Sequence, residues 1–416
     1  MFFQRFIDSV SYLESLSFSF DDSFRDIYMS CWIEFAEKTD NLPVFAVVDG
    51  SRGSTTFRGG LKVVCVRALA NVYEGWNIVG NVFDVDVRVG QRLQGESFFM
   101  SALELKCLRK ALEKYEGVTV ALYDGSLYPT LHSLLVKFTS HQVQAYKEYL
   151  NSFYDLYKFA IEHDIVLVGV TKDSFVNYLA ARVLADRISL ENPELGKRLE
   201  RLRSMASLRD EISKSQLENR DVYLREVDRM SFSSDEETLD EFASKAGFTV
   251  PLVLAPQPLC LSEEVKAGTK KWTDAKIRER LLKSGPPFDH VVEALDRIYE
   301  LPPAVMSYWR PYHGVGVYRL DVCGHFFGLN SKWNLTEADF FLEESVEKLK
   351  HIIVLLNSLS PEPFAVKPLL DVDDLVRFKV KVYRECYEPI IVDALKKAGL
   401  KPLLTKRDLR EMAVRM

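Results

Sequence analysis

Apolar runs and polar turns alternate regularly along the first third of the chain. Three consecutive apolar runs occupy Val44–Val48, Leu61–Leu69 and Val79–Val89, and their β-branched residues favour strands. Between Gln94 and Gly117 the apolar residues instead recur every three to four positions, which is typical of an amphipathic helix. A fourth apolar run, Val118–Tyr123, comes next. The predicted order is therefore strand, strand, strand, helix, strand.

Helices and further strands alternate through the rest of the chain. Residues 2–40 carry apolar and aromatic side chains near helical spacing, which predicts one or two helices. The segment from Leu190 to Ser233 interleaves Arg and Glu with Leu, so we expect helices with a solvated face there. Helices are also predicted over residues 142–163, 175–188, 338–357 and 372–398, and strands over residues 165–170, 247–254, 305–309 and 315–322.

These elements predict an α/β protein with one large body. A chain of 416 residues can bury a core of this size. We expect an N-terminal helical arm over residues 1–42. The body would cover residues 43–416, with a helical insertion at about 190–245 and a C-terminal helix.

Composition places the chain among soluble intracellular proteins. Its 47% hydrophobic and 27% charged residues are ordinary for a globular protein, and no stretch is apolar over membrane-spanning length. The start MFFQRFIDSV lacks a signal-peptide pattern, and six scattered cysteines without a CxxC pair predict reduced thiols. We therefore expect a cytoplasmic protein without a membrane partner. The net charge of −6 gives no general attraction to nucleic acid, so such a ligand would need a local basic site.

Two predicted strands end in the same three residues, Asp-Gly-Ser, which begin at Asp49 and Asp124. Alone, an Asp-Gly pair after a strand most often forms a turn. Two such pairs on the first and fourth strands, with a glutamate on the intervening helix, match the acidic residues of an RNase H-like fold. Glu104 is the candidate because it borders the sheet-facing side of the helix. Glu113 near the helix end and Glu96 at its start have simpler explanations, namely solvent and the helix dipole.

The grouped carboxylates predict a metal centre. Asp49, Glu104 and Asp124 offer oxygen ligands, which suit Mg²⁺ or Mn²⁺. Two such ions about 4 Å apart can activate a water and stabilise the leaving oxygen in phosphodiester hydrolysis. Lys172 directly follows a buried strand, where it would neutralise a phosphate or orient the water. A solvated lysine is an equal alternative for that position.

In these motifs the chain resembles the NurA nuclease family. VFAVVDGSRG resembles the first motif of the family, ALYDGSLYP its second aspartate strand, and IVLVGVTKDS its lysine-bearing strand end. GFTVPLVL and VYRLDV resemble later strands, the latter through an Arg-x-acid pattern at Arg319 and Asp321. The first three segments are fairly specific in combination and order, whereas the last two are weak alone.

The resemblance implies a fold, an activity and partners. It implies an RNase H-like, Mn²⁺-dependent nuclease that degrades DNA 5′ to 3′, cuts single strands and acts in the end resection of double-strand breaks. It also implies a homodimer that works with a HerA-type hexameric ATPase. No GxxxxGK[ST] phosphate loop is present, so the chain itself is not predicted to be the ATPase.

The chain departs from the family pattern near its C-terminus. The family carries a Tyr-Pro element followed by an active-site His, whereas this chain has PFAVKPLLDVDD, with Phe364 or Ala365 in the Tyr position and Asp373 in the His position. Asp373 would act as a fourth metal carboxylate, or the change would weaken the activity. Asp371, Asp373 and Asp374 at a helix start have an equally good explanation as capping residues. Two rival functions follow: a non-catalytic scaffold for DNA ends or the translocase, and an enzyme acting on RNA or branched DNA.

Overall fold

Three long strands follow one another and form an antiparallel meander: β2 (Val44–Thr56), β3 (Leu61–Glu74) and β4 (Asn77–Gln91). The helix α3 (Glu96–Lys114) and the strand β5 (Val120–Asp124) come next, which confirms the predicted order. They belong to a computed structural model that describes residues 22–129, 138–172, 174–200, 202, 205–254, 265–267, 270–272, 274–330, 339–400 and 402–403.

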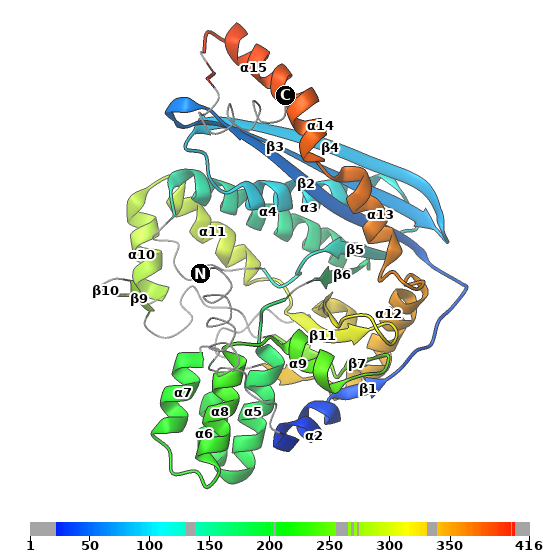
Figure 1. The fold of residues 1–416 in the computed structure, drawn as a ribbon, viewed down its shortest axis with the longest axis vertical. Coiled ribbons are helices and arrows are strands. Elements are labelled where there is room, and N and C mark those ends of the chain that lie inside the picture. Colours follow the sequence, from blue (N-terminus) through cyan, green and yellow to red (C-terminus); the bar gives the residue numbers. More distant parts are fainter. Residues whose placement is uncertain are drawn as a thin grey trace, which may run out of the picture.

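One mixed sheet crosses the molecule between layers of helices (Figure 1). Its other strands are β1 (Trp32–Glu34), β6 (Val166–Thr171), β7 (Gly247–Thr249), β8 (Leu252–Val253), β11 (Ala304–Arg310), β12 (Tyr318–Cys323) and β13 (Phe340–Phe341). The strand order is β1-β7-β11-β12-β6-β5-β2-β3-β4, with β8 joined to β11 and β13 to β8. β5 pairs in parallel with both β2 and β6. A separate small sheet pairs β9 (Val265–Ala267) with β10 (Lys270–Trp272).

The alternation of side chains along β2 divides the core between the two faces of the sheet. Ala46 and Val48 belong to the cluster that contains α3 and α4 (Ser140–Glu162), whereas Phe45 and Val47 belong to the cluster that contains α12 (Val346–Ser358) and α13 (Lys367–Val376). No helix in the described ranges is long and apolar enough to cross a membrane. The other helices are α2 (Asp22–Ser30), α5 (Tyr178–Glu191), α6 (Pro193–Leu199), α7 (Met205–Ser213), α8 (Arg220–Met230), α9 (Asp235–Phe242), α10 (Asp274–Ser284), α11 (Phe288–Ile298), α14 (Val380–Val382) and α15 (Glu388–Lys397).

Two element predictions near the chain ends are wrong in part. The predicted N-terminal helix ends at Ser30, and Trp32–Glu34 pairs with β7 instead. The apolar residues Cys31, Ile33 and Phe35 lie two positions apart, a spacing that suits a strand. The helix predicted over residues 372–398 begins earlier, at Lys367, and is interrupted by an extended link at Arg377–Lys379 and a π-helical turn before α15. Residues 1–21 lie outside the described chain.

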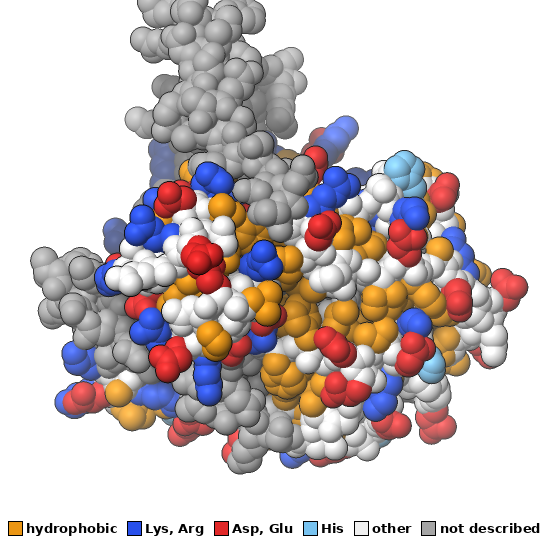
Figure 2. Space-filling view, turned by 90° about the horizontal axis from the view of Figure 1, so that it is seen from below, with side chains coloured by type: hydrophobic (Ala, Val, Ile, Leu, Met, Phe, Trp, Pro, Cys, Tyr) orange, Lys and Arg blue, Asp and Glu red, His pale blue; other side chains and the backbone are white. Residues whose placement is uncertain are grey.

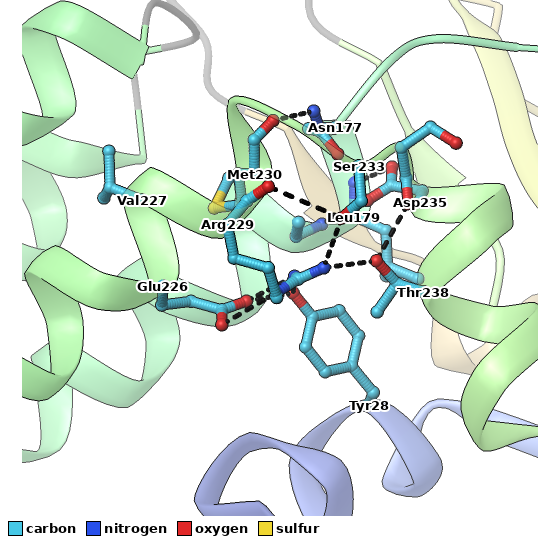
Figure 3. Close-up of polar contacts among 12 residues, drawn as sticks. Tyr28, Asn177, Leu179, Glu226, Val227, Arg229, Met230, Ser233, Asp235 and Thr238 are labelled. Carbon is cyan, nitrogen blue, oxygen red and sulfur yellow. Dashed lines mark hydrogen bonds and ion pairs between the residues drawn. The ribbon is translucent and has the colours of Figure 1, made fainter. Parts of the chain in front are cut away.

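The charged segment after β6 is helical as predicted, but it is not only a solvated surface. The side chains of Glu226 and Arg229 on α8 are 2% and 5% exposed and form an ion pair. Figure 3 shows the hydroxyl of Tyr28 on α2 beside this pair; it donates to Glu226 at 2.8 Å and accepts from Arg229 at 2.8 Å. Sequence alternation of charge could not distinguish this buried pair from its exposed neighbours.

The edge strand β4 exposes an apolar row on one face. Side chains at alternate positions are each 45–55% exposed, although most are Val or Phe. On the same face the C-terminal segment covers β3, because Phe378 and Tyr383 pack on Val63 and Cys65. The row, called the β4 row below, consists of Val79, Phe83, Val85, Val87 and Val89.

Candidate metal centre

Asp49 and Asp124 follow equivalent positions of two neighbouring parallel strands. The last pair that joins β2 to β5 is Val48 with Tyr123, so the next residue on each strand is an aspartate. β5 ends at Asp124, whereas β2 continues to Thr56. The edge of β2 is therefore free of β5 beyond Asp49. In open α/β sheets, ligands bind at such carboxyl ends of strands.

Glu104 reaches this place from α3, and Gly50 makes room for it. A Cβ atom at position 50 would overlap the carboxyl group of Glu104. Tyr123 on β5 donates a hydrogen bond to Glu104 Oε2 at 3.1 Å. The turn predicted at Gly50 and Ser51 is wrong, because both residues continue β2. The glycine is needed here for the close approach of a helix side chain.

The three acids influence one another electrostatically. Burial, and then the charge of Asp124, raises the pKa of Asp49 to about 7, although the backbone N–H of Gly50 donates to its Oδ1 at 2.7 Å. Burial, and then the charge of Asp49, raises the pKa of Glu104 to about 8. Asp49 is 8% and Glu104 2% exposed. Buried carboxylates are costly without a positive partner, so the site favours a bound cation.

Lys172 lies next to these acids, at the end of β6. Its Nζ donates to Asp124 Oδ2 at 2.7 Å. Burial lowers the pKa of Lys172, but the carboxylate of Asp124 outweighs it and holds that pKa above its usual value. The ammonium group is therefore charged beside the carboxylates, where a phosphate would enter. Asp173, the next residue, lies outside the described chain.

The donor set fits a hard divalent cation. Asp49, Glu104 and Asp124 offer carboxylate oxygens, the ligands that Mg²⁺ and Mn²⁺ take. Among the described residues, no three Asp, Glu, His or Cys side chains are close enough as they stand to hold one ion together. Asp124 is turned toward Lys172 instead. Binding of one ion by all three carboxylates would therefore require side-chain rearrangement, including release of Asp124 from Lys172.

The family of this chain follows from a sequence match that covers most of its length. A profile of the NurA domain matches residues 43–325, more than half of the chain. The chain belongs to the NurA family. No curated protein is similar enough in sequence to count as a relative.

One solved NurA structure shares this fold, and others are less similar. The NurA nuclease from Sulfolobus solfataricus is 15% identical, the match covers 95% of this chain and 94% of that chain, and the TM-score is 0.50. A structure of NurA bound to dAMP and manganese is 14% identical over 98% and 97% of the two chains, with a TM-score of 0.39. Endonuclease V from Streptomyces avermitilis is 9% identical over 85% and 89%, with a TM-score of 0.27. The predicted RNase H-like architecture, a mixed sheet flanked by helices, is confirmed.

Asp373, at the position where the resemblance to NurA nucleases led us to expect a histidine, contributes to the electrostatics of this region. It lies on α13, and its charge contributes to the raised pKa of Asp49, after burial and the charge of Asp124. Arg377 forms an ion pair with it. The capping explanation is wrong, because α13 begins at Lys367 and Asp373 lies in its last two turns.

The NurA-like Arg-x-acid pattern forms a buried ion pair on β12. Arg319 Nε donates to Asp321 Oδ1 at 2.9 Å, and the two side chains are 4% and 0% exposed. Ser126, which closes the second Asp-Gly-Ser, donates to the other oxygen of Asp321. The pair thus anchors the turn after Asp124. The sequence analysis missed Ser126 as a partner of Asp321 and Tyr123 as a partner of Glu104. Their position near Asp124 in the sequence was the only available signal.

Proposed function

We propose that this NurA-family chain is a Mn²⁺- or Mg²⁺-dependent deoxyribonuclease that hydrolyses phosphodiester bonds. The observation that carries the proposal is that Asp49 and Asp124 occupy equivalent positions on two neighbouring strands, while Glu104 of α3 packs against Gly50, the residue after Asp49. Burial and then the charge of Asp124 raise the pKa of Asp49, and burial and then the charge of Asp49 raise that of Glu104. Lys172 pairs with Asp124, and a bound cation would supply the positive partner that the buried carboxylates of Asp49 and Glu104 need.

Each residue has a defined task in this proposal. Asp49, Glu104 and Asp124 would hold one or two divalent ions, and Asp373 would be a fourth acid. When bound, the ions would supply Lewis-acid stabilisation of the phosphate and a more acidic water. Lys172, charged beside Asp124, would bind a non-bridging phosphate oxygen and orient the strand. Tyr123 holds Glu104 in place through its hydroxyl.

A local basic site beside the acids supports DNA as the substrate. Arg377, Lys379 and Lys381 follow α13, and no Asp or Glu occurs from residue 375 to 384. The backbone N–H of Phe378 bonds to Ser51, two residues after Asp49, so this basic segment adjoins the acids. On the face shown in Figure 2, by contrast, Lys and Arg are intermixed with Asp and Glu around a hydrophobic area. Phosphate backbones bind where positive charge is concentrated.

The test is cleavage of single-stranded and blunt duplex DNA with Mn²⁺, Mg²⁺ or EDTA. Asp49→Asn should reduce cleavage at least about a hundredfold, because it removes one ligand of the centre. Asp84→Asn is the matched control, since Asp84 lies two strands away on β4 and pairs with exposed Lys110. Wild-type protein without metal-dependent cleavage would support the alternative, a NurA-like scaffold, which the replacement of the NurA histidine by Asp373 favours.

The biological setting extends this proposal. Family membership supports 5′ to 3′ exonuclease and single-strand endonuclease activities, action in DNA end resection, and a HerA-type hexameric ATPase as partner. End-labelled duplexes would give the polarity directly. Stimulation of cleavage by a HerA-type ATPase with ATP, and none with a hydrolysis-deficient ATPase, would establish the partnership. Competition by RNA or branched DNA would reveal a different substrate.

We also propose that the chain forms a homodimer through the β4 row. The row is apolar, solvent-exposed and located on the last strand of the sheet, where backbone groups on the outer edge are unpaired within the sheet. Exposed apolar patches of this kind mark interaction sites. We further propose a cytoplasmic location, which accords with the proposed nuclease function.

A further inference from the structure

Arg67 on β3 binds the C-terminal end of α13. Its Nη2 donates to the carbonyl of Arg377 at 2.5 Å, and its Nε donates to the carbonyl of Val376. The guanidinium also lies over the ring of Phe378, with 4.1 Å from Cζ to the ring centroid. The last carbonyls of a helix lack partners within the helix, and a cation there complements the helix dipole. Arg67 therefore caps α13 from the sheet.

Alternate residues of β2 hold the segment that follows α13. Ser51 pairs with Arg67 across the two strands, and its Oγ accepts the backbone N–H of Phe378 at 2.8 Å. Gly53 leaves space for the ring of Tyr383, which a Cβ atom would overlap. Asp49 lies two residues before Ser51 on the same face of β2. The face that presents the metal carboxylate thus also fixes α13 and its continuation.

This attachment determines where Asp373 lies. The backbone N–H of Arg377 bonds to the carbonyl of Asp373 at 2.9 Å, so Asp373 begins the turn that Arg67 caps. The side chain of Asp373 is 24% exposed, pairs with Arg377, and its charge contributes to the raised pKa of Asp49. Two carbonyls require two N–H donors in a fixed plane, which arginine has and lysine lacks.

We propose that Arg67 is a positioning residue that holds Asp373 at the metal centre by capping α13. The proposal rests on the proposed function in one respect, because it takes Asp373 to be a metal ligand. Residues that orient metal ligands typically contribute 10–100-fold to metal affinity. Arg67→Ala should therefore weaken Mn²⁺ binding about tenfold.

The experiment is a double-mutant cycle on the full chain, read by calorimetric titration with Mn²⁺ alone. The variants are Arg67→Ala, Asp373→Asn and the double variant. Each single variant should weaken Mn²⁺ binding by a similar factor. When Asp373→Asn is already present, adding Arg67→Ala should weaken Mn²⁺ binding by less than about a further twofold. Arg88→Ala is the matched control, because Arg88 lies on β4 and binds Glu148 of α4 on the opposite face. It should bind Mn²⁺ like wild type.

A second readout and a second variant separate positioning from loss of folding. Hydrogen exchange of the amides of residues 369–377 should accelerate in Arg67→Ala and stay unchanged in Arg88→Ala. Arg67→Lys keeps the charge, should fold, and should still weaken Mn²⁺ binding. Mn²⁺ binding that is unaltered in both Arg67→Ala and Arg67→Lys would overturn the proposal. The proposal would also be overturned if Arg67→Ala weakened Mn²⁺ binding by the same factor in the wild-type and the Asp373→Asn backgrounds. Wild-type protein that binds Mn²⁺ without cleaving DNA would refute only the nuclease proposal, whereas wild-type protein that binds no Mn²⁺ would refute both.

Discussion

At the scale of single residues, the segment Asp-Gly-Ser-Arg-Gly is a set of contacts rather than a turn. Asp49 supplies a carboxylate, Gly50 admits Glu104, Ser51 binds the backbone of the C-terminal segment, and Gly53 admits an aromatic ring. Every second residue of β2 thereby meets the same C-terminal layer. A turn of the same sequence would need positive φ at its glycine, whereas neither Gly50 nor Gly53 has one.

Gly50→Ala should reduce metal-dependent cleavage at least about tenfold, because the new methyl group displaces the carboxyl group of Glu104. Cleavage rates at saturating Mn²⁺ check this expectation. Gly90→Ala on β4 is the control, since its Cβ would lie no closer than 3.6 Å to any neighbour. An active Gly50→Ala enzyme would show that Glu104 is not needed at the centre.

The pH dependence of stability should have an unusual sign in the metal-free protein. The folded-state pKa values of Asp49 and Glu104, about 7 and about 8, are raised above their unfolded values, so the folded chain binds more protons between pH 4 and 8. Their contribution to stability is present at low pH and is lost as the pH rises through 7 and 8.

In EDTA, Tm should fall between pH 5 and 8, and Glu104→Gln should flatten that fall. Added Mn²⁺ should raise Tm more at pH 8 than at pH 5, because protons compete for the ligands. A Tm difference between pH 5 and 8 that Glu104→Gln leaves unchanged would contradict this reading.

The sequence could predict those site residues that are marked by their immediate sequence neighbours. Asp49 and Asp124 stand out because each ends an apolar run with the same triplet, and Lys172 follows a third run. Glu104 could be chosen from helical spacing. The roles of Ser51 and Arg67 depend on a helix more than 300 residues away, and their sequence neighbourhood gives no sign of it.

At the scale of elements, the strand and helix order of the body was predictable, whereas the C-terminal helix was not. Helical periodicity continues from α13 to α15, but tertiary contacts divide it: the sheet binds the link at Arg377–Lys379, and Pro389 lacks the N–H that would continue the preceding turn. The charged helices after β6 illustrate the same limit. Their pattern predicted solvated surfaces, but α8 turns its Glu226–Arg229 pair toward α2 and α9.

Breaking that buried pair should strongly destabilise the protein. Arg229→Met leaves the carboxylate of Glu226 buried without its cation, which costs about 3–5 kcal/mol. Urea denaturation monitored by circular dichroism measures the loss. Lys214→Met, directly after α7, is the control, because the pair of Lys214 with Asp210 is exposed and its loss should change stability by less than about 0.5 kcal/mol. Equal stability of the two variants would mean that the ion pair is not the contact that joins α2 to α8.

At the scale of the whole molecule, the uncovered part of the sheet is informative. Phe83 pairs through Leu69 with the position of Asp49, so the β4 row lies on the face of the sheet to which the side chain of Asp49 belongs. The C-terminal segment covers this face over β2 and β3 but leaves β4 open. A stable dimer buries about 800 Å² on each partner, and a 15-residue edge strand offers the length for such a contact.

Val87→Asp should therefore convert a dimer into a monomer. Val87 lies within the row and is 51% exposed, so a carboxylate there is hydrated in the monomer but would be buried without a partner in the dimer. Sedimentation velocity gives the oligomeric state, and an unchanged Tm at low protein concentration would exclude misfolding. Leu190→Asp is the matched control, since Leu190 is 78% exposed on α5, outside the row. Because the row lies on the same face of the sheet as Asp49 and Asp124, the dimer would place these two acids of both copies on the side of the contact, and DNA held between two copies would meet them together. A monomeric wild-type chain, or a Val87→Asp chain that still dimerises, would exclude this arrangement.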